Sequence, residues 1–232
     1  MSEYLAFLRD RGVLAVKPYM EPALRARLGR FRDGPREFFG EVDYREPIAM
    51  RLHGFHWFDK AWMASEPASS PIRAPALLYN IFDTRTEGFA TGWEEWAMAL
   101  GLFDGRPRSR ELVYILVAQR AARAIGDLRM HGSGHSLEQA AAFASANTPR
   151  GWLRLTGNLV RGEQHLYLQQ PAYGTSYLVG KIQIEQLMAA RRRQLGDGYS
   201  TKAFLDEFTT AGLIPVSLLS WQLTGERPAW LN

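Results

Sequence analysis

Apolar residues at helical spacing run through most of this sequence and limit the folds it can adopt. Over positions 107–130 they recur at intervals of three and four, which is the period of an amphipathic helix. Pro107 suits the first turn of that helix, and Gly132 lies just beyond its end. No segment of comparable length alternates apolar and polar residues as a half-buried strand does. The pattern therefore predicts a mostly α fold with negligible β structure.

Capping and helix-breaking residues indicate where further helices begin and end in the rest of the chain. Ser136 followed by Gln139 predicts a capping box that opens a short alanine-rich helix ending near Asn147. We expect further helices at about 3–10, 21–28, 46–64, 76–102, 156–169, 175–195, 201–211 and 216–223. Neither a repeat nor a long linker interrupts the series, so we expect a single helical domain over residues 1–232. Residues 1–45 are expected to be the most loosely attached part, or to contact a partner.

Composition narrows the function classes. The 232 residues, 46% of them hydrophobic and 12% aromatic, are enough for a sizeable globular core. Without cysteine the chain has no disulfide, thiolate metal site or cysteine nucleophile, and the cytoplasm is the expected compartment. The start at Met1 carries no basic, apolar leader, and no apolar run approaches the roughly 18 residues of a membrane span. We therefore expect no contact with a membrane.

The net charge of +4 points only weakly to a partner. Much of the excess lies at Arg191, Arg192 and Arg193, just before a predicted helix stop at Gly196. Cations at a helix C-terminus are favoured by the helix dipole, and no nucleic-acid recognition motif accompanies them. We expect no nucleic-acid binding, while a small anionic substrate is compatible with this balance.

Acidic residues on an otherwise apolar and aromatic segment are the strongest functional signal. Glu87 and Glu94 are seven residues apart, so they share one face of a helix. Carboxylates on an inward face must be compensated by a cation, a metal or hydrogen bonds. An active-site helix and a buried structural ion pair both fit. Asp83 and Arg85 add charge just ahead of Glu87, where pairing within the group is the structural alternative.

A histidine-rich segment precedes that helix. His53, His56 and Asp59 follow one another at intervals of three, which on a helix places two imidazoles and a carboxylate on one side. The spacing differs from H-E-x-x-H, and Gly54 stands where that motif has its glutamate. A metal site and two histidines in local hydrogen bonds both remain open.

Two later segments carry cations and hydroxyls. Arg123 lies eight residues before His131, so the two side chains can share a cleft in which the arginine holds an anionic group by paired hydrogen bonds. Gly174 and Thr175 allow a tight helix start whose free amides can meet an anion. The side chains of Tyr173, Tyr177 and Lys181 follow at four-residue steps. They suit stabilisation of a developing negative charge, or simply form a packing stripe with the lysine reaching water.

In order along the chain, these segments resemble the bacterial domain-of-unknown-function family 885, a helical group related to metallopeptidases. The resemblance, over about 84–220, rests on Glu87-Gly88-Phe89-Ala90 with Glu94 (for E-G-W-A-x-Y-x-E), Arg120-Ala121-Ala122-Arg123 before His131, Gln170-Pro171 to Tyr177, Gly180-Lys181, and Gly212 to Pro215. It implies the C-terminal half of a gluzincin-like metallopeptidase fold.

The family resemblance also bears on a metal. In that family a zinc helix with H-E followed by P-G-H lies upstream, and the glutamate matched by Glu87 resembles a third zinc ligand. Residues 51–57 of this chain lack both the glutamate and the P-G-H. We therefore expect no cofactor; if zinc is present, the resemblance implies His53, His56 and Glu87 as its ligands.

Split members of this family resemble the two-subunit enzymes that close the aziridine ring of azabicyclic antibiotics. This likeness implies a catalytic subunit of bacterial secondary metabolism, in which an amine displaces an anionic leaving group such as sulfate within a small, anionic, amino-acid-derived substrate. It further implies a second subunit that supplies the family's N-terminal helical region. The residues implied for the site are Glu87, Asp83 and Asp59 as candidate bases, Arg123 and Lys181, with Arg85, as cations, and His131, Tyr173 and Tyr177 beside them. A metal-dependent hydrolase or peptidase and a non-catalytic partner subunit are the alternatives.

Overall fold

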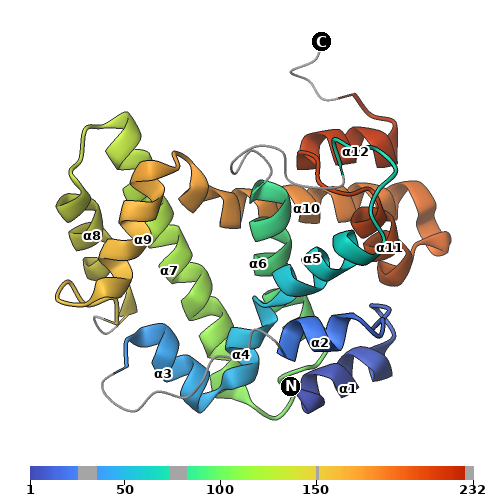
Figure 1. Cartoon of the computed structure of the whole chain (residues 1–232), viewed down its shortest axis with the longest axis horizontal. Helices are drawn as coiled ribbons and strands as arrows, with labels where there is room; N and C mark the ends of the chain where they lie inside the picture. Colours follow the sequence, from blue (N-terminus) through green and yellow to red (C-terminus); the bar gives the residue numbers. More distant parts are fainter. Residues whose placement is uncertain (26–35, 74–82, 150–151, 228–232) are drawn as a thin grey trace.

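The computed structural model describes residues 1–25, 36–73, 83–149 and 152–227, and all its regular elements in these ranges are helical (Figure 1). This confirms the mostly α prediction. The elements are α1 (Ser2–Arg11), α2 (Met20–Arg25), α3 (Phe38–Arg45), α4 (Pro47–Leu52), α5 (Phe55–Ser65), α6 (Asp83–Ala99), α7 (Pro107–Gly132), α8 (Leu137–Ala146), α9 (Asn158–Gln169), α10 (Tyr173–Leu195), the 3₁₀ turn η2 (Gly196–Gly198), α11 (Thr201–Thr210) and α12 (Val216–Thr224).

Helix α6 lies at the centre of the molecule and packs most extensively against α10 (Figure 1). Glycines at the crossing bring the two backbones together. A Cβ on Gly88 would lie 2.5 Å from the Cα of Gly180, and a Cβ on Gly180 would lie 2.8 Å from the Cα of Gly88. Distances this short exclude any side chain at either position without movement of a backbone. The close crossing sets how near residues of α6 and α10 can come to one another.

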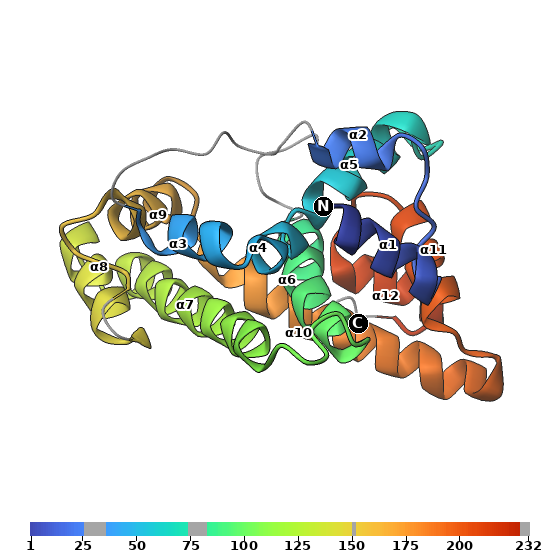
Figure 2. The same cartoon turned by 90° about the horizontal axis from the view of Figure 1, so that it is seen from below.

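The main hydrophobic core joins the N-terminal helices to α6, α11 and α12, and two smaller clusters lie among α7, α8, α9 and the start of α10 (Figures 1 and 2). Tyr4, Leu5 and Leu8 of α1 are fully buried in the main core. The Tyr4 hydroxyl also accepts a hydrogen bond of 2.6 Å from the indole nitrogen of Trp93. The described part of residues 1–45 thus contributes to the main core; the sequence had predicted a segment that is loosely attached or contacts a partner.

The helix predicted over 46–64 is two helices in the structure. Helix α4 ends at Leu52, and α5 begins at Phe55 after a turn at His53 and Gly54. At Gly54 a Cβ would lie only 2.8 Å from the carbonyl oxygen of Arg51, so this turn requires a glycine. His53, His56 and Asp59 therefore do not form one continuous helical ladder.

Most other predicted boundaries agree with the structure to within a few residues. The capping box between Ser136 and Gln139 is present at the start of α8, as predicted. Helix α3 was not predicted, because Gly40 interrupts its short apolar pattern. Positions 26–28 and 76–82, which were predicted to be helical, lie outside the described residues. None of the described helices combines the length and apolar character needed to cross a bilayer.

Candidate functional site

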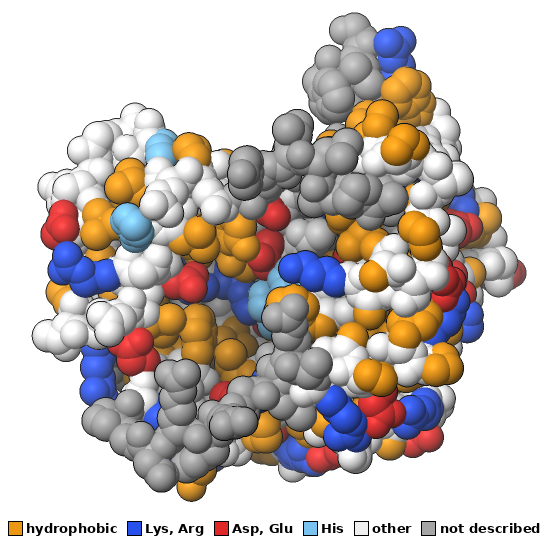
Figure 3. All heavy atoms as spheres, viewed as in Figure 1, with side chains coloured by type: hydrophobic (Ala, Val, Ile, Leu, Met, Phe, Trp, Pro, Cys, Tyr) orange, Lys and Arg blue, Asp and Glu red, His pale blue; other side chains and the backbone are white. Residues whose placement is uncertain are grey.

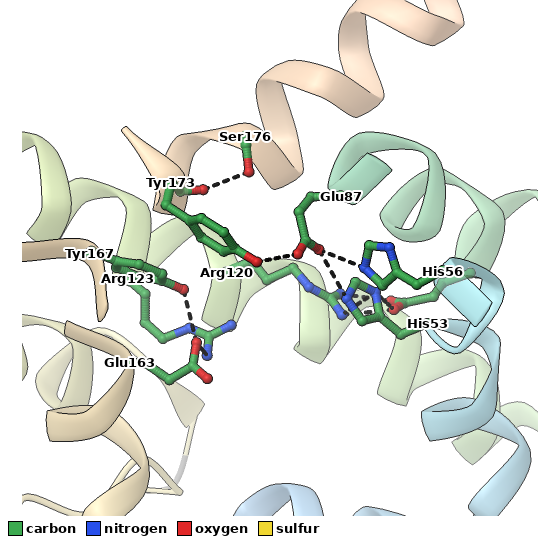
Figure 4. Close-up of polar contacts among 10 residues, drawn as sticks. His53, His56, Glu87, Arg120, Arg123, Glu163, Tyr167, Tyr173 and Ser176 are labelled. Carbon is green, nitrogen blue, oxygen red and sulfur yellow. Dashed lines mark hydrogen bonds and ion pairs between the residues drawn. The ribbon is translucent and has the colours of Figure 1, made fainter. Parts of the chain in front are cut away.

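Glu87 on α6 is the centre of a buried polar cluster, with 7% of its surface exposed. The Nε2 atoms of His56 and His53 lie 2.9 and 3.3 Å from the same carboxylate oxygen of Glu87. The other oxygen accepts a hydrogen bond from the hydroxyl of Tyr173, at the start of α10 (Figure 4). Three segments far apart in sequence thus meet at one carboxylate.

The cluster keeps Glu87 ionised. Burial raises the pKa of Glu87, but hydrogen bonds from His53 and His56 outweigh it and hold the pKa well below its ordinary value. Burial and the Arg120 guanidinium lower the pKa of His53, yet its hydrogen bonds to Glu87 and Glu94 leave this pKa raised overall. Burial and the nearby Glu87 charge raise the pKa of Tyr173, which therefore remains a protonated donor. Glu87 therefore stays ionised and accepts hydrogen bonds from its neighbours.

A second carboxylate on α6, that of Glu94, contacts the other ring nitrogen of His53. Glu94 is completely buried and accepts two hydrogen bonds of 2.7 Å from the guanidinium of Arg120 on α7. The Nδ1 atom of His53 lies 3.0 Å from Glu94 and 3.2 Å from Arg120. Because arginine can only donate, Nδ1 either donates to Glu94 or accepts from Arg120. Glu87 and Glu94 share one face of α6, as predicted from the sequence, and each contacts one ring nitrogen of His53.

A buried cation lies near this cluster. Arg123 on α7 is 2% exposed and forms an ion pair of 2.7 Å with Glu163 on α9. Glu163 also accepts a hydrogen bond of 3.0 Å from the hydroxyl of Tyr167. The Tyr167 ring stacks on the Tyr173 ring, 5.9 Å between centroids. Tyr173 therefore links the Arg123 group to the Glu87 group, as Figure 4 shows.

The molecular surface is hollowed near the centre of the face in Figure 3. Basic, acidic and histidine side chains gather on the floor of this hollow, between hydrophobic walls. Charges of both signs are therefore presented to solvent at one depression.

Asp83 lies one helical turn before Glu87 on α6. One of its carboxylate oxygens is buried and has no hydrogen-bond partner among the described residues. Burial, reinforced by the negative charge of Glu87, raises the pKa of Asp83 to about 7. A carboxyl group with this pKa exchanges protons readily near neutral pH.

Asp59, Arg85 and Lys181 lie outside the cluster. Asp59 and Arg85 form a buried ion pair with each other, and the Arg85 guanidinium lies over the ring of Phe208. Arg85 therefore pairs with neither Asp83 nor Glu87, which had been the structural alternative. The ammonium group of Lys181 is held by Glu95 at 2.9 Å and Glu185 at 2.7 Å. These three predicted site residues thus form ion pairs with groups outside the cluster, and their catalytic roles stay predictions.

His131 is also held by structural contacts. Its Nε2 atom lies 3.0 Å from the backbone oxygen of Tyr167 and 3.6 Å from Asp127. The carboxylate of Asp127 accepts hydrogen bonds from the backbone nitrogens of Gly174 at 2.8 Å and Ala172 at 3.3 Å. The prediction that amides at this helix start meet an external anion is therefore wrong for Gly174, because Asp127 fills that role.

Tyr177 lies beside the cluster. Its ring centroid is 6.0 Å from that of His53 and 5.7 Å from the Arg120 guanidinium. Burial, followed by the nearby Glu87 charge, raises the pKa of Tyr177, so its hydroxyl stays protonated. Of the predicted hydroxyl and ammonium stripe on α10, both tyrosines reach the cluster and the lysine does not.

Sequence reasoning missed Glu163 and Tyr167. They lie four residues apart in the segment 156–169, so they share a face of that predicted helix. An acidic residue one turn before an aromatic residue was the only sequence feature that marked this pair. It did not indicate that Glu163 forms an ion pair with Arg123, some forty positions earlier.

The histidines and Glu87 also meet the first requirements of a metal site. One possible ligand atom from each of His53, His56 and Glu87 lies within 4.8 Å of the other two. Two imidazoles and a carboxylate are a common zinc donor set, and an outer carboxylate such as Glu94 typically orients a ligating histidine. The residues present thus fit a divalent metal by donor type and spacing.

Comparison with known proteins identifies the family. A family described as "Bacterial protein of unknown function (DUF885)" matches residues 56–223, which include His56, Glu87 and the whole Arg123 group. The chain belongs to this family. No curated protein matches the chain.

A solved structure of a longer chain contains a similar fold. It is that of a protein from Colwellia psychrerythraea described as a lipoprotein, with 24% sequence identity and a TM-score of 0.63. The match covers 76% of the present chain and 29% of that one. This DUF885 member therefore corresponds to less than a third of the length of the protein it resembles.

Proposed function

We propose that this protein is the catalytic subunit of a bacterial biosynthetic enzyme that closes an aziridine ring. In the proposed reaction an amine attacks the neighbouring carbon of a small amino-acid-derived substrate and displaces an anionic group such as sulfate. The observation that carries the proposal is the pairing of an ionised carboxylate, Glu87, with a buried guanidinium, Arg123, on either side of Tyr173. A substrate with an amine at one carbon and an oxyanion at the next matches these two charges.

The acidic side of the site supports binding and deprotonation of the amine. Glu87, whose pKa is held low, suits a permanent anchor for a substrate ammonium group. Asp83, one turn away and with a pKa of about 7, suits the group that takes the ammonium proton. This assigns separate roles to two of the three carboxylates considered from the sequence. Asp59 is paired with Arg85 and has no part in the proposal.

The basic side supports departure of the leaving group. As the nitrogen–carbon bond forms, the carbon–oxygen bond to sulfate breaks and the electron pair leaves with the sulfate oxygen. The guanidinium of Arg123 suits stabilisation of that developing charge, since it is buried and its Nε–H donor has no partner among the described residues. The amine proton goes to Asp83, so the reaction needs neither a redox partner nor water. Holding both ends of the substrate in reach of each other supplies much of the acceleration.

The proposal includes a second polypeptide. Apolar residues that are not buried follow α7 at alternating intervals of four and three: Tyr114, Ala118, Ile125 and Leu128 are exposed, and Ala121 among them is partly buried. This spacing is that of a helix seam that packs against another helix. Val179 and Ile182 are exposed on α10, which packs on α7 (Figure 2). A helical partner subunit that covers this α7 seam fits these observations. The cytoplasmic location expected from the sequence is part of the same proposal.

A metal-dependent hydrolase is the second candidate, because His53, His56 and Glu87 present three ligand atoms together. These residues would hold the ion, which would supply Lewis-acid polarisation of a substrate carbonyl or ester. For His53 to be a ligand, its Nε2 atom must lose its proton, so Nδ1–H would donate to Glu94. Metal binding and the hydrogen bond from His53 Nε2 to Glu87 are thus mutually exclusive.

The first test uses 2-aminoethyl hydrogen sulfate, the simplest substrate with both groups, and the protein freed of metal by a chelator. We expect release of sulfate together with the protonated aziridine, and loss of both products in Glu87→Gln and Arg123→Met. Activity that returns only when zinc is added back would support the hydrolase. Full activity of both variants in the complex with the partner would indicate a non-catalytic subunit.

A further inference from the structure

Gln119 on α7 is a completely buried polar side chain. Its exposed surface is 0%, and both its amide nitrogen and its amide oxygen lack a partner among the described residues. A buried amide without partners loses its hydrogen bonds to water and gains none in return, so such groups are uncommon in folded proteins. Leucine would fit the helix at this position without that cost. Gln119 therefore calls for an explanation beyond packing.

A second unsatisfied donor lies on the same face of the same helix. Arg123 follows Gln119 by four residues, which places their side chains next to each other on α7. The Nη1 atom of Arg123 is held by Glu163, but its Nε atom is buried and has no partner among the described residues. The unpaired edge of the guanidinium and the unpaired amide are thus neighbours in one buried location.

The available atoms define the chemistry of a ligand. The Nε–H of Arg123 and the amide N–H of Gln119 both donate, so together they suit an oxygen atom that carries negative charge. The amide oxygen of Gln119 accepts, so it suits an N–H or O–H group next to that oxyanion. Glu163 neutralises much of the Arg123 charge from the other side. The location is therefore suited to an oxyanion whose neighbouring N–H or O–H group meets the amide oxygen of Gln119.

We propose that Gln119 and the Nε edge of Arg123 form a binding subsite for an oxyanion that has an N–H or O–H group beside it, as in an amino-acid derivative. Resting on the proposed function, this subsite adds Gln119 as a specificity residue for the substrate. The oxyanion is either the leaving sulfate or the substrate's carboxylate. Both place a charged oxygen against the same two donors.

Binding of three small probes distinguishes a sulfate from a carboxylate as the oxyanion in this subsite. Isothermal titration calorimetry of the full chain with 2-aminoethyl hydrogen sulfate, β-alanine and ethanolamine compares a sulfate, a carboxylate and no oxyanion. We expect one of the first two to bind and ethanolamine not to bind. In Gln119→Leu the dissociation constant of the binding probe should rise by about tenfold or more, in line with loss of hydrogen bonds to a charged group. The matched control is Gln186→Leu, an exposed glutamine on α10, which should bind like the wild type.

Thermal unfolding supplies the second readout. Because Gln119→Leu removes an unpaired buried amide, its melting temperature without probe should equal or exceed that of the wild type. Weaker binding by a protein that is at least as stable supports the subsite. A marked loss of stability would show that the amide has a structural role and would overturn it. Unchanged affinity in Gln119→Leu, or binding of no oxyanion probe by the wild type, would overturn it as well.

Binding and ring closure can fail separately. If the probe binds through Gln119 and Arg123 but no aziridine forms, the subsite stands and the proposed reaction does not. If Gln119→Leu closes the ring with unchanged kcat/KM, the reaction stands and the subsite is wrong.

Discussion

Gly180 on α10 lies directly against Gly88 on α6, and this contact brings Tyr173 within hydrogen-bond reach of Glu87. A Cβ at position 180 would lie 2.8 Å from the Cα of Gly88, closer than real Cβ atoms approach. We predict that Gly180→Ala forces the helices apart and lowers the free energy of unfolding by about 1–3 kcal/mol. Chemical denaturation measures this change.

Gly162 provides the matched control. It lies within α9, where an added Cβ meets nothing within 4 Å. Gly162→Ala should therefore leave the stability unchanged or raise it by about 0.5–1 kcal/mol. Equal effects of the two substitutions would show that the crossing does not depend on glycine.

The ion pair of Glu94 and Arg120 is predicted to be essential to the fold around His53. Arg120→Met leaves Glu94 charged and completely buried, so the free energy of unfolding should fall by about 3–5 kcal/mol. Lys202→Met, which breaks an exposed pair with Asp206, should cost less than about 1 kcal/mol. A small effect of Arg120→Met would mean that Glu94 is solvated in solution.

Asp83 should give the protein a characteristic pH dependence of stability. Its pKa is raised to about 7 in the folded chain, so between about pH 4 and about pH 7 the folded state binds more protons than the unfolded state. This contribution to the free energy of unfolding therefore decreases as the pH rises through that interval. In the Asp83→Asn variant the side chain is neutral at every pH, so this pH-dependent contribution is absent. The melting temperature of the variant relative to the wild type should rise between about pH 5 and about pH 8; a constant difference would contradict the raised pKa.

The α7 seam is predicted to bind the partner subunit. Leu128→Glu places a charge at the C-terminal end of the exposed apolar seam, so the complex should weaken by about tenfold or more, because a desolvated unpaired charge at an interface is costly. Leu168→Glu, at another exposed leucine on α9, should bind the partner normally. Sedimentation or light scattering of the mixed subunits measures both. A chain that remains monomeric with the partner present would contradict the seam.

Local sequence pattern predicted most of the fold but only part of the site. Helices such as α7 and α8 follow from apolar spacing and caps, which involve neighbours in sequence. The turn at His53 and Gly54 was missed because either a helix or a break fits that segment until its contact with Glu87 is known. Asp127 and Glu163 were missed for a similar reason, since their partners Gly174 and Arg123 are about forty residues or more away. The His53, His56 and Glu87 group was considered from residue types, and the structure brings these three together.

The most direct test of ring closure follows the oxygen atoms. The reaction is run on a β-amino sulfate in water enriched in oxygen-18, with metal chelated, and both products are analysed by mass spectrometry. Ring closure breaks the carbon–oxygen bond by attack of the amine, so sulfate and aziridine should both form without any label. Label in the sulfate or in the organic product would show attack by water, which would contradict ring closure and favour a hydrolase.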